Sequence, residues 1–65
     1  MQNVYDFYMG CDLLPLSAKV NLYDAMSKQK IKENYQDEKN DIFDNMTVKG
    51  YRWNPKTNLL MIWCS

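Results

Sequence analysis

The chain has 65 residues, enough for one domain with a single core, and 46% of them are apolar, too many for a disordered chain. Eight basic and eight acidic residues leave no net charge. With no histidine, two cysteines and two glycines, the sequence excludes a catalytic triad, a four-ligand zinc site and a glycine-rich phosphate loop. We therefore expect no enzyme activity, no cofactor and no metal.

The amino-terminal residues predict a short helix over residues 3–11. Asn3 is suited to cap it, because its side chain can accept a hydrogen bond from a free backbone N–H. Apolar side chains recur at helical spacing at Val4, Phe7, Tyr8 and Cys11. Alternate apolar residues in the same segment are also typical of a strand, which leaves that alternative open. Gly10 and Pro15 argue against continuation of the helix.

The same segment also indicates the cellular compartment in which the protein is expected. "MQNVYDFYMGCD" has no basic start, so it does not resemble a secretory signal, and no apolar run approaches the roughly 18 residues of a membrane span. We expect a cytoplasmic protein that does not bind membranes. Cys11 and Cys64 should then stay reduced, with a disulfide between them as the alternative.

Residues 18–29 predict a second helix. Ser17 precedes a stripe of residues at helical spacing, formed by Ala18, Leu22, Ala25, Met26 and Gln29. Val20 and Tyr23 widen this stripe to more than half of the circumference. We therefore expect a central helix that packs on two neighbours.

Residues 31–46 predict a third, amphipathic helix. Its apolar base consists of Ile31, Tyr35, Ile42, Phe43 and Met46. On the opposite side lies a ridge of carboxylates, formed by Glu33, Asp37, Asp41 and Asp44. A solvated helix face is the simpler explanation of such a ridge. Carboxylates in the last turn of a helix are unfavourable, however, because they interact badly with the negative end of the helix dipole. Their presence there favours the alternative that the ridge contacts a basic partner.

Residues 47–64 predict a β-hairpin. The runs "MTVKGYRW" and "LLMIWC" are rich in strand-forming residues, and "NPKTN" between them is typical of a turn. Alternation places Lys49, Tyr51 and Trp53 on one face of the first strand and Val48, Gly50 and Arg52 on the other. The second strand is apolar throughout, so we expect both of its faces to be covered.

Together these elements predict one α+β domain over residues 1–65, with two or three helices followed by a C-terminal antiparallel β-hairpin. The first functional hypothesis is a small non-enzymatic protein-binding module, an inhibitor or adaptor encoded by a phage or mobile element and acting in the bacterial host cell. Seven lysines and seven asparagines, a usage common where DNA is AT-rich, fit that origin. Glu33, Asp37, Asp41 and Asp44 would contact a basic surface of a host protein, which could itself bind nucleic acid, because carboxylates in a row mimic a phosphate backbone.

Two alternatives remain. The hairpin places cations beside aromatic rings, which is one way to bind single-stranded nucleic acid. The residues concerned are Lys49, Tyr51, Arg52, Trp53 and Lys56. We expect such binding to be weak, because the acidic segment would repel the same backbone. The other alternative is a homodimeric structural module.

Overall fold

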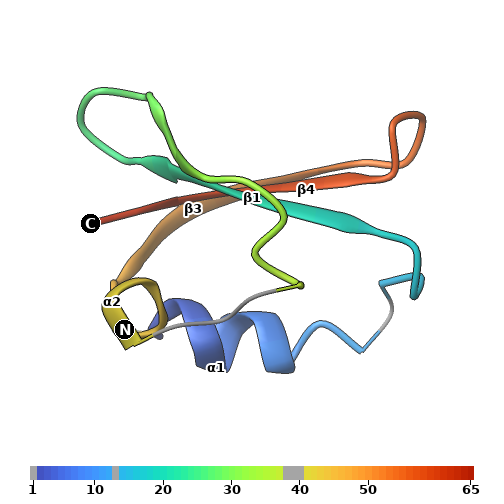
Figure 1. The fold of residues 1–65 in the computed structure, drawn as a ribbon, viewed down its shortest axis with the longest axis horizontal. Coiled ribbons are helices and arrows are strands. Elements are labelled where there is room, and N and C mark those ends of the chain that lie inside the picture. Colours follow the sequence, from blue (N-terminus) through green and yellow to red (C-terminus); the bar gives the residue numbers. More distant parts are fainter. Residues whose placement is uncertain (1, 13, 38–40) are drawn as a thin grey trace.

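Two short helices pack on one side of a four-stranded sheet in a computed structural model that describes residues 2–12, 14–37 and 41–65 (Figure 1). The elements in chain order are α1 (Val4–Met9), β1 (Lys19–Asp24), β2 (Lys30–Lys32), α2 (Asp41–Asp44), β3 (Val48–Asn54) and β4 (Leu59–Cys64). The strand order is β2-β1-β4-β3. β1 and β4 run parallel at the centre, and each edge strand pairs antiparallel with its neighbour.

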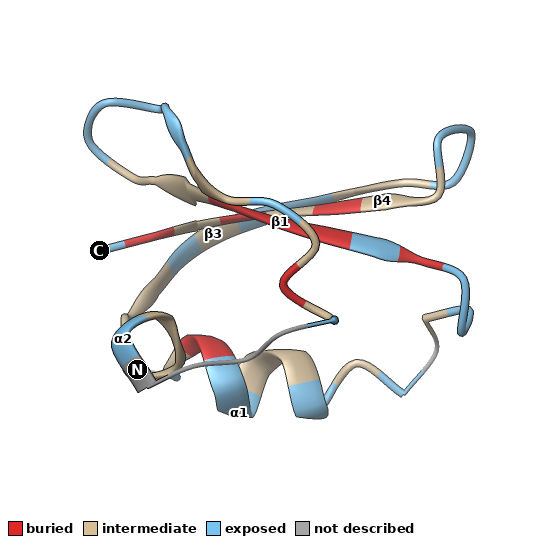
Figure 2. Cartoon of the chain, in the orientation of Figure 1, coloured by how far each residue is buried: buried red, intermediate tan, exposed pale blue. Residues whose placement is uncertain are grey.

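The core lies between the sheet and the helices. Side chains of β4 alternate between the two sides of the sheet, so that every second one is buried against the helix side. The residues buried there are Val20, Leu22, Leu60, Ile62 and Cys64, together with Val4 from α1 and Tyr35 (Figure 2). The intervening residues of β4 are only half-buried, so the expectation that both faces of this strand are covered is wrong.

The α+β class and the C-terminal hairpin are confirmed. β3 and β4 pair antiparallel around a turn at residues 55–58, where Asn58 takes a φ of 56° that asparagine tolerates well. The amino-terminal helix is also confirmed, and the side chain of Asn3 caps it by accepting a hydrogen bond from the backbone N–H of Asp6 at 2.8 Å. The predicted order, helices first and then the hairpin, is wrong, because strands occupy the middle of the chain.

The helix predicted over residues 18–29 is wrong, since this segment forms β1 and a turn. Its sequence "KVNLYD" alternates polar and apolar residues, and only Val20 and Leu22 of the apolar ones reach the core. Each pairs with an apolar residue of β4, Val20 with Leu60 and Leu22 with Ile62. Burial between two neighbouring strands therefore outweighs the helical pattern.

The helix predicted over residues 31–46 is confirmed only over Asp41–Asp44, which form α2, and is wrong over residues 31–37; residues 38–40 lie outside the described part. After β2 the chain continues along the edge of β1. The N–H of Tyr35 donates to the carbonyl of Val20 at 2.7 Å, and the N–H of Val20 donates to Oε1 of Gln36 at 2.8 Å. Asn34 takes a φ of 56°, which a helix does not allow.

A bulge in β3 changes which residues share a face. Val48 pairs with Cys64, but the next pair along the strand is Gly50 with Trp63, so Lys49 is the extra residue. Val48 therefore lies on the same side as Tyr51 and Trp53, toward the helices. The predicted alternation is confirmed from Gly50 to Trp53 and is wrong at Val48. Neither helix among the described residues is long and apolar enough to cross a membrane.

Candidate functional site

Charge is divided between two parts of the chain. Residues 19–33 and 47–65, which contain all four strands, hold seven basic and two acidic residues, a net charge of about +5. Residues 1–18 and 34–46, which contain both helices, hold six acidic residues and one basic residue, a net charge of about −5. The described residues of this neutral chain thus form a basic strand layer and an acidic helix layer, and such a charge asymmetry influences which partners the protein can bind.

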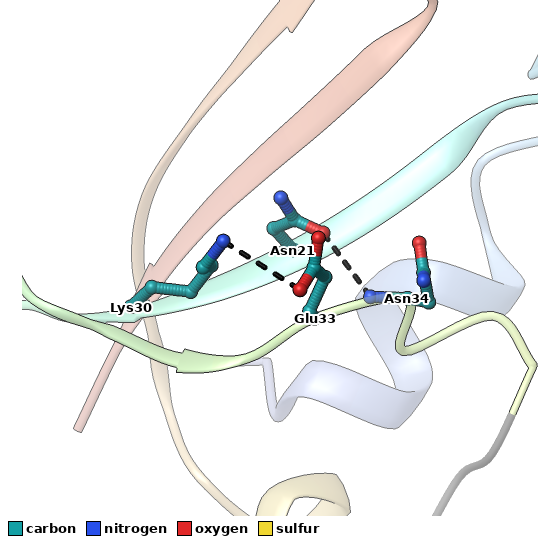
Figure 3. Close-up of polar contacts among 4 residues, drawn as sticks. All are labelled: Asn21, Lys30, Glu33 and Asn34. Atoms are coloured by element: carbon teal, nitrogen blue, oxygen red, sulfur yellow. Dashed lines mark hydrogen bonds and ion pairs between the residues drawn. The ribbon is translucent and has the colours of Figure 1, made fainter.

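The four predicted contact carboxylates do not form one ridge. Glu33 directly follows β2 and pairs with Lys30, with 3.7 Å between the carboxylate oxygen and Nζ. Figure 3 shows this pair beside Asn21, whose side-chain oxygen accepts a hydrogen bond from the N–H of Asn34 at 3.1 Å. Asp41 begins α2, and Asp37 is exposed in the turn before residues 38–40. Their role in binding a partner stays a prediction.

Asp44 has a structural partner. Its carboxylate accepts a hydrogen bond from the hydroxyl of Tyr35, a side chain with no exposed surface. Burial, and then the hydrogen bond to Asp44, raise the pKa of Tyr35 above its ordinary value. The hydroxyl is therefore held in its neutral form, and the pair ties α2 to the core.

A pocket of about 380 Å³ lies beside the exposed Asp37. The polar residues in its wall are Tyr8, Asp12, Gln36 and Asp37, and Cys11, Leu14, Pro15, Leu16, Ala18 and Val20 complete the lining. The pocket thus has two carboxylates and no basic residue in its described lining. The sequence interpretation missed Asp12, because 25 positions separate it from Asp37 and nothing local marks the pair.

The five residues of the predicted nucleic-acid site are divided between the two sides of the sheet. Tyr51 and Trp53 face the helices, with the ring centroid of Tyr51 5.0 Å from that of Phe7. Arg52 is exposed on the opposite side, where it pairs with Met61. Lys49 is exposed in the bulge, and Lys56 is exposed in the hairpin turn.

A second pocket, of about 370 Å³, lies between the end of α1 and the hairpin. Phe7, Leu14, Tyr51, Trp53 and Leu60 make it mainly apolar. It adjoins the first pocket, since Cys11, Asp12 and Leu14 line both.

Both cysteines are free thiols. Cys11 donates to the carbonyl of Phe7 at 3.2 Å, and Cys64 donates to the carbonyl of Tyr23 at 3.7 Å. Burial is the main cause that raises the pKa of each thiol, so both are poor nucleophiles at neutral pH. Among the described residues, no three carboxylate or thiol side chains come together as a metal site.

No protein-family model, curated protein or solved structure matches this chain.

Proposed function

We propose that this chain is a small non-enzymatic protein-binding module that engages a basic surface of another protein through its acidic helix layer. The observation that carries the proposal is the pocket between Asp12 and Asp37, which has two carboxylates and no described cation in its wall. Its volume, about 380 Å³, is ample for one long side chain. A lysine or arginine of the partner would enter it and find a carboxylate on each side.

The surrounding charge favours the same kind of partner. Asp6, in the first turn of α1, and Asp12 and Asp37 are all exposed, so a basic partner can reach them. The described cations of the chain all lie in residues 19–33 and 47–65, which contain the four strands. The field of the acidic layer would speed association with a basic surface, and a carboxylate enclosed in the complex would slow dissociation.

The geometry changes which carboxylates carry the proposal. Of the four predicted contact residues, the proposal retains Asp37 and Asp41, and it adds Asp12. Glu33 is paired with Lys30 in the strand layer, and Asp44 is held by Tyr35, so both are left out. An inhibitor or adaptor of a phage or mobile element remains the context that we propose for such a module.

The test compares substitutions that remove equal charge from the two layers. Tagged wild-type protein is used to recover a partner from a bacterial lysate, and mass spectrometry identifies it. Binding kinetics are then measured at two salt concentrations for the wild type, Asp12→Asn, Asp37→Asn and the matched control Glu33→Gln.

We expect Asp12→Asn and Asp37→Asn each to weaken binding about tenfold, mainly through faster dissociation, because the enclosed cation of the partner loses a carboxylate. Glu33→Gln should bind like the wild type. Equal loss in all three variants would indicate general attraction rather than a site. Unchanged binding for both aspartate variants would refute the proposal.

A further inference from the structure

The side of the sheet opposite the helices carries apolar side chains that contribute nothing to the core. We call this side the open face; it includes Lys19, Tyr23, Gly50, Arg52, Leu59, Met61 and Trp63. Tyr23, Leu59, Met61 and Trp63 are half-buried, and none of them belongs to the core cluster or packs against it. Both helices lie on the other side (Figure 1), so no described helix covers these side chains.

An aromatic pair stands at one end of the open face. Tyr23 of β1 pairs in register with Trp63 of β4, and their rings stack with centroids 5.6 Å apart and planes inclined by 29°. On the other side of Trp63, its neighbour in β3 is Gly50. A Cβ atom placed on Gly50 would meet no atom within 4 Å. The position beside Trp63 at Gly50 is therefore open rather than filled by another side chain.

Cations lie along the open face and in the loops at both ends of the sheet. Arg52 and Lys19 are exposed on the open face, and Lys30, also exposed, pairs in register with Tyr23. The loops at residues 25–29 and 55–58 curl away from the helices at opposite ends of the sheet and carry Lys28 and Lys56 (Figure 1). Two acids lie near these cations in the described part of the chain: Asp24, at the end of β1, interacts electrostatically with Lys28, and Glu33 is paired with Lys30. The acids that were expected to repel a phosphate backbone belong mainly to the helix layer.

We propose that the open face binds single-stranded nucleic acid. A base stacks beside Trp63 over Gly50, and phosphates on either side contact Arg52 and Lys19. Stacking on aromatic side chains combined with cations along the backbone is the general mode of single-strand binding, and it requires unpaired bases. The site differs from the predicted hairpin site, because it uses Arg52 but neither Tyr51 nor Trp53.

Charge argues against a second copy of the chain as the occupant. Two open faces packed on each other would bring Lys19, Lys30 and Arg52 of one copy toward the same cations of the other. Like charges brought together in an interface are costly, whereas a polyanion is attracted by all of them.

The test measures the fluorescence anisotropy of a labelled oligothymidylate of about 15 nucleotides as protein is added, with an unlabelled duplex of equal length as competitor. With about three phosphates neutralised, the logarithm of the affinity should fall with the logarithm of the salt concentration with a slope of about −2. The single strand should bind in preference to the duplex. No binding to about 100 µM protein in low salt would overturn the proposal.

Gly50→Val is the decisive variant. It fills the space beside Trp63 with a residue that favours strands, so the fold should be as stable as the wild type in urea, while affinity for the oligonucleotide falls about tenfold. Trp63→Ala should lose as much affinity for the oligonucleotide. Arg52→Gln should reduce the magnitude of the slope of log affinity against log salt concentration by about 0.7. Tyr51→Ala removes an aromatic ring from the other side of the same strand and should bind normally.

Two outcomes would overturn the proposal even if an oligonucleotide binds. One is unchanged affinity in Gly50→Val. The other is a dimer, seen by sedimentation, that dissociates in Gly50→Val, because a second copy would then cover the face. Asp12→Asn should leave oligonucleotide binding unchanged, which keeps this test separate from that of the protein-binding site.

Discussion

Replacement of Tyr35 by phenylalanine removes one hydroxyl from the core and leaves the ring in place. The ring keeps its edge-to-face contact with Tyr8, at 5.5 Å between centroids, so no cavity forms. What is lost is the hydrogen bond to the carboxylate of Asp44. Hydrogen bonds to charged groups contribute about 1.5–3 kcal/mol, and because Asp44 is only half-buried we expect a loss near the lower end, about 1.5 kcal/mol. In a domain of this size that lowers Tm by about 6–12 °C.

The same pair predicts how stability depends on alkaline pH. The raised pKa of Tyr35 means that the unfolded chain releases this proton at a lower pH than the folded protein. The stability that the Tyr35 hydroxyl contributes is fully present below about pH 10, the ordinary pKa of tyrosine, and is lost as the pH rises above this value. Tyr35→Phe has no such hydroxyl, so its stability does not show this loss at alkaline pH. The stabilities of wild type and variant should therefore converge above about pH 10.

Urea unfolding followed by circular dichroism at neutral pH and at about pH 11 measures both effects. The matched control is Tyr51→Phe, which changes a tyrosine that is 62% exposed. If Tyr35→Phe unfolds at the same urea concentration as Tyr51→Phe, or shows the same loss of stability at alkaline pH as the wild type, the reasoning about the buried pair is refuted.

Other substitutions test single elements of the fold. Asn3→Ala removes the cap of α1 and should cost about 1 kcal/mol in urea unfolding; an unchanged midpoint would contradict the capping role. Ile62 of β4 is fully buried, so Ile62→Ala should lower the free energy of unfolding by about 2–5 kcal/mol. A smaller loss of stability would argue that β4 is not central to the core. Asp24 accepts a hydrogen bond from the N–H of Ser27, and this bond lowers the pKa of the Asp24 carboxyl. The stability that the ionised carboxylate contributes should therefore disappear as the pH falls below about 4. Asp24→Asn should make the stability of the protein less sensitive to acid. Cys64 should react with a thiol reagent only when the protein is unfolded, and rapid reaction of the folded protein would show that its thiol is accessible.

The elements predicted from the sequence are those whose contacts are local. In α1, Asn3 caps a backbone N–H three residues away, and in the hairpin Asn54 pairs with Leu59 across a short turn. The misassigned segment, β1, pairs in parallel with β4, so Val20 meets Leu60 forty positions later. A pattern read within a window of twelve residues contains no information on such a partner, and the helical spacing of Leu22 and Met26 then dominates.

The charged surfaces depend on the same long-range contacts. Glu33 and Asp37 lie one helical turn apart in the predicted helix, but Asn34, with a φ of 56°, bends the chain between them. Glu33 consequently remains with the strands, and Asp37 reaches the pocket that Asp12 also lines. Similarly, the bulge at Lys49 moves Val48 to the face that Tyr51 and Trp53 share, which the alternation of the sequence does not reveal.

The claim that the two layers serve opposite kinds of ligand can be tested in one experiment. Correlation spectra of 15N-labelled protein are recorded during titration with oligothymidylate, and then with a short arginine-rich peptide added to the same sample. The account predicts two separate sets of shifted amides. The oligonucleotide should shift residues around Gly50 and Trp63, and the peptide should shift residues around Asp12 and Asp37 without reversing the first set. Shifts of the same amides by both ligands, or peptide shifts confined to the strand layer, would contradict it.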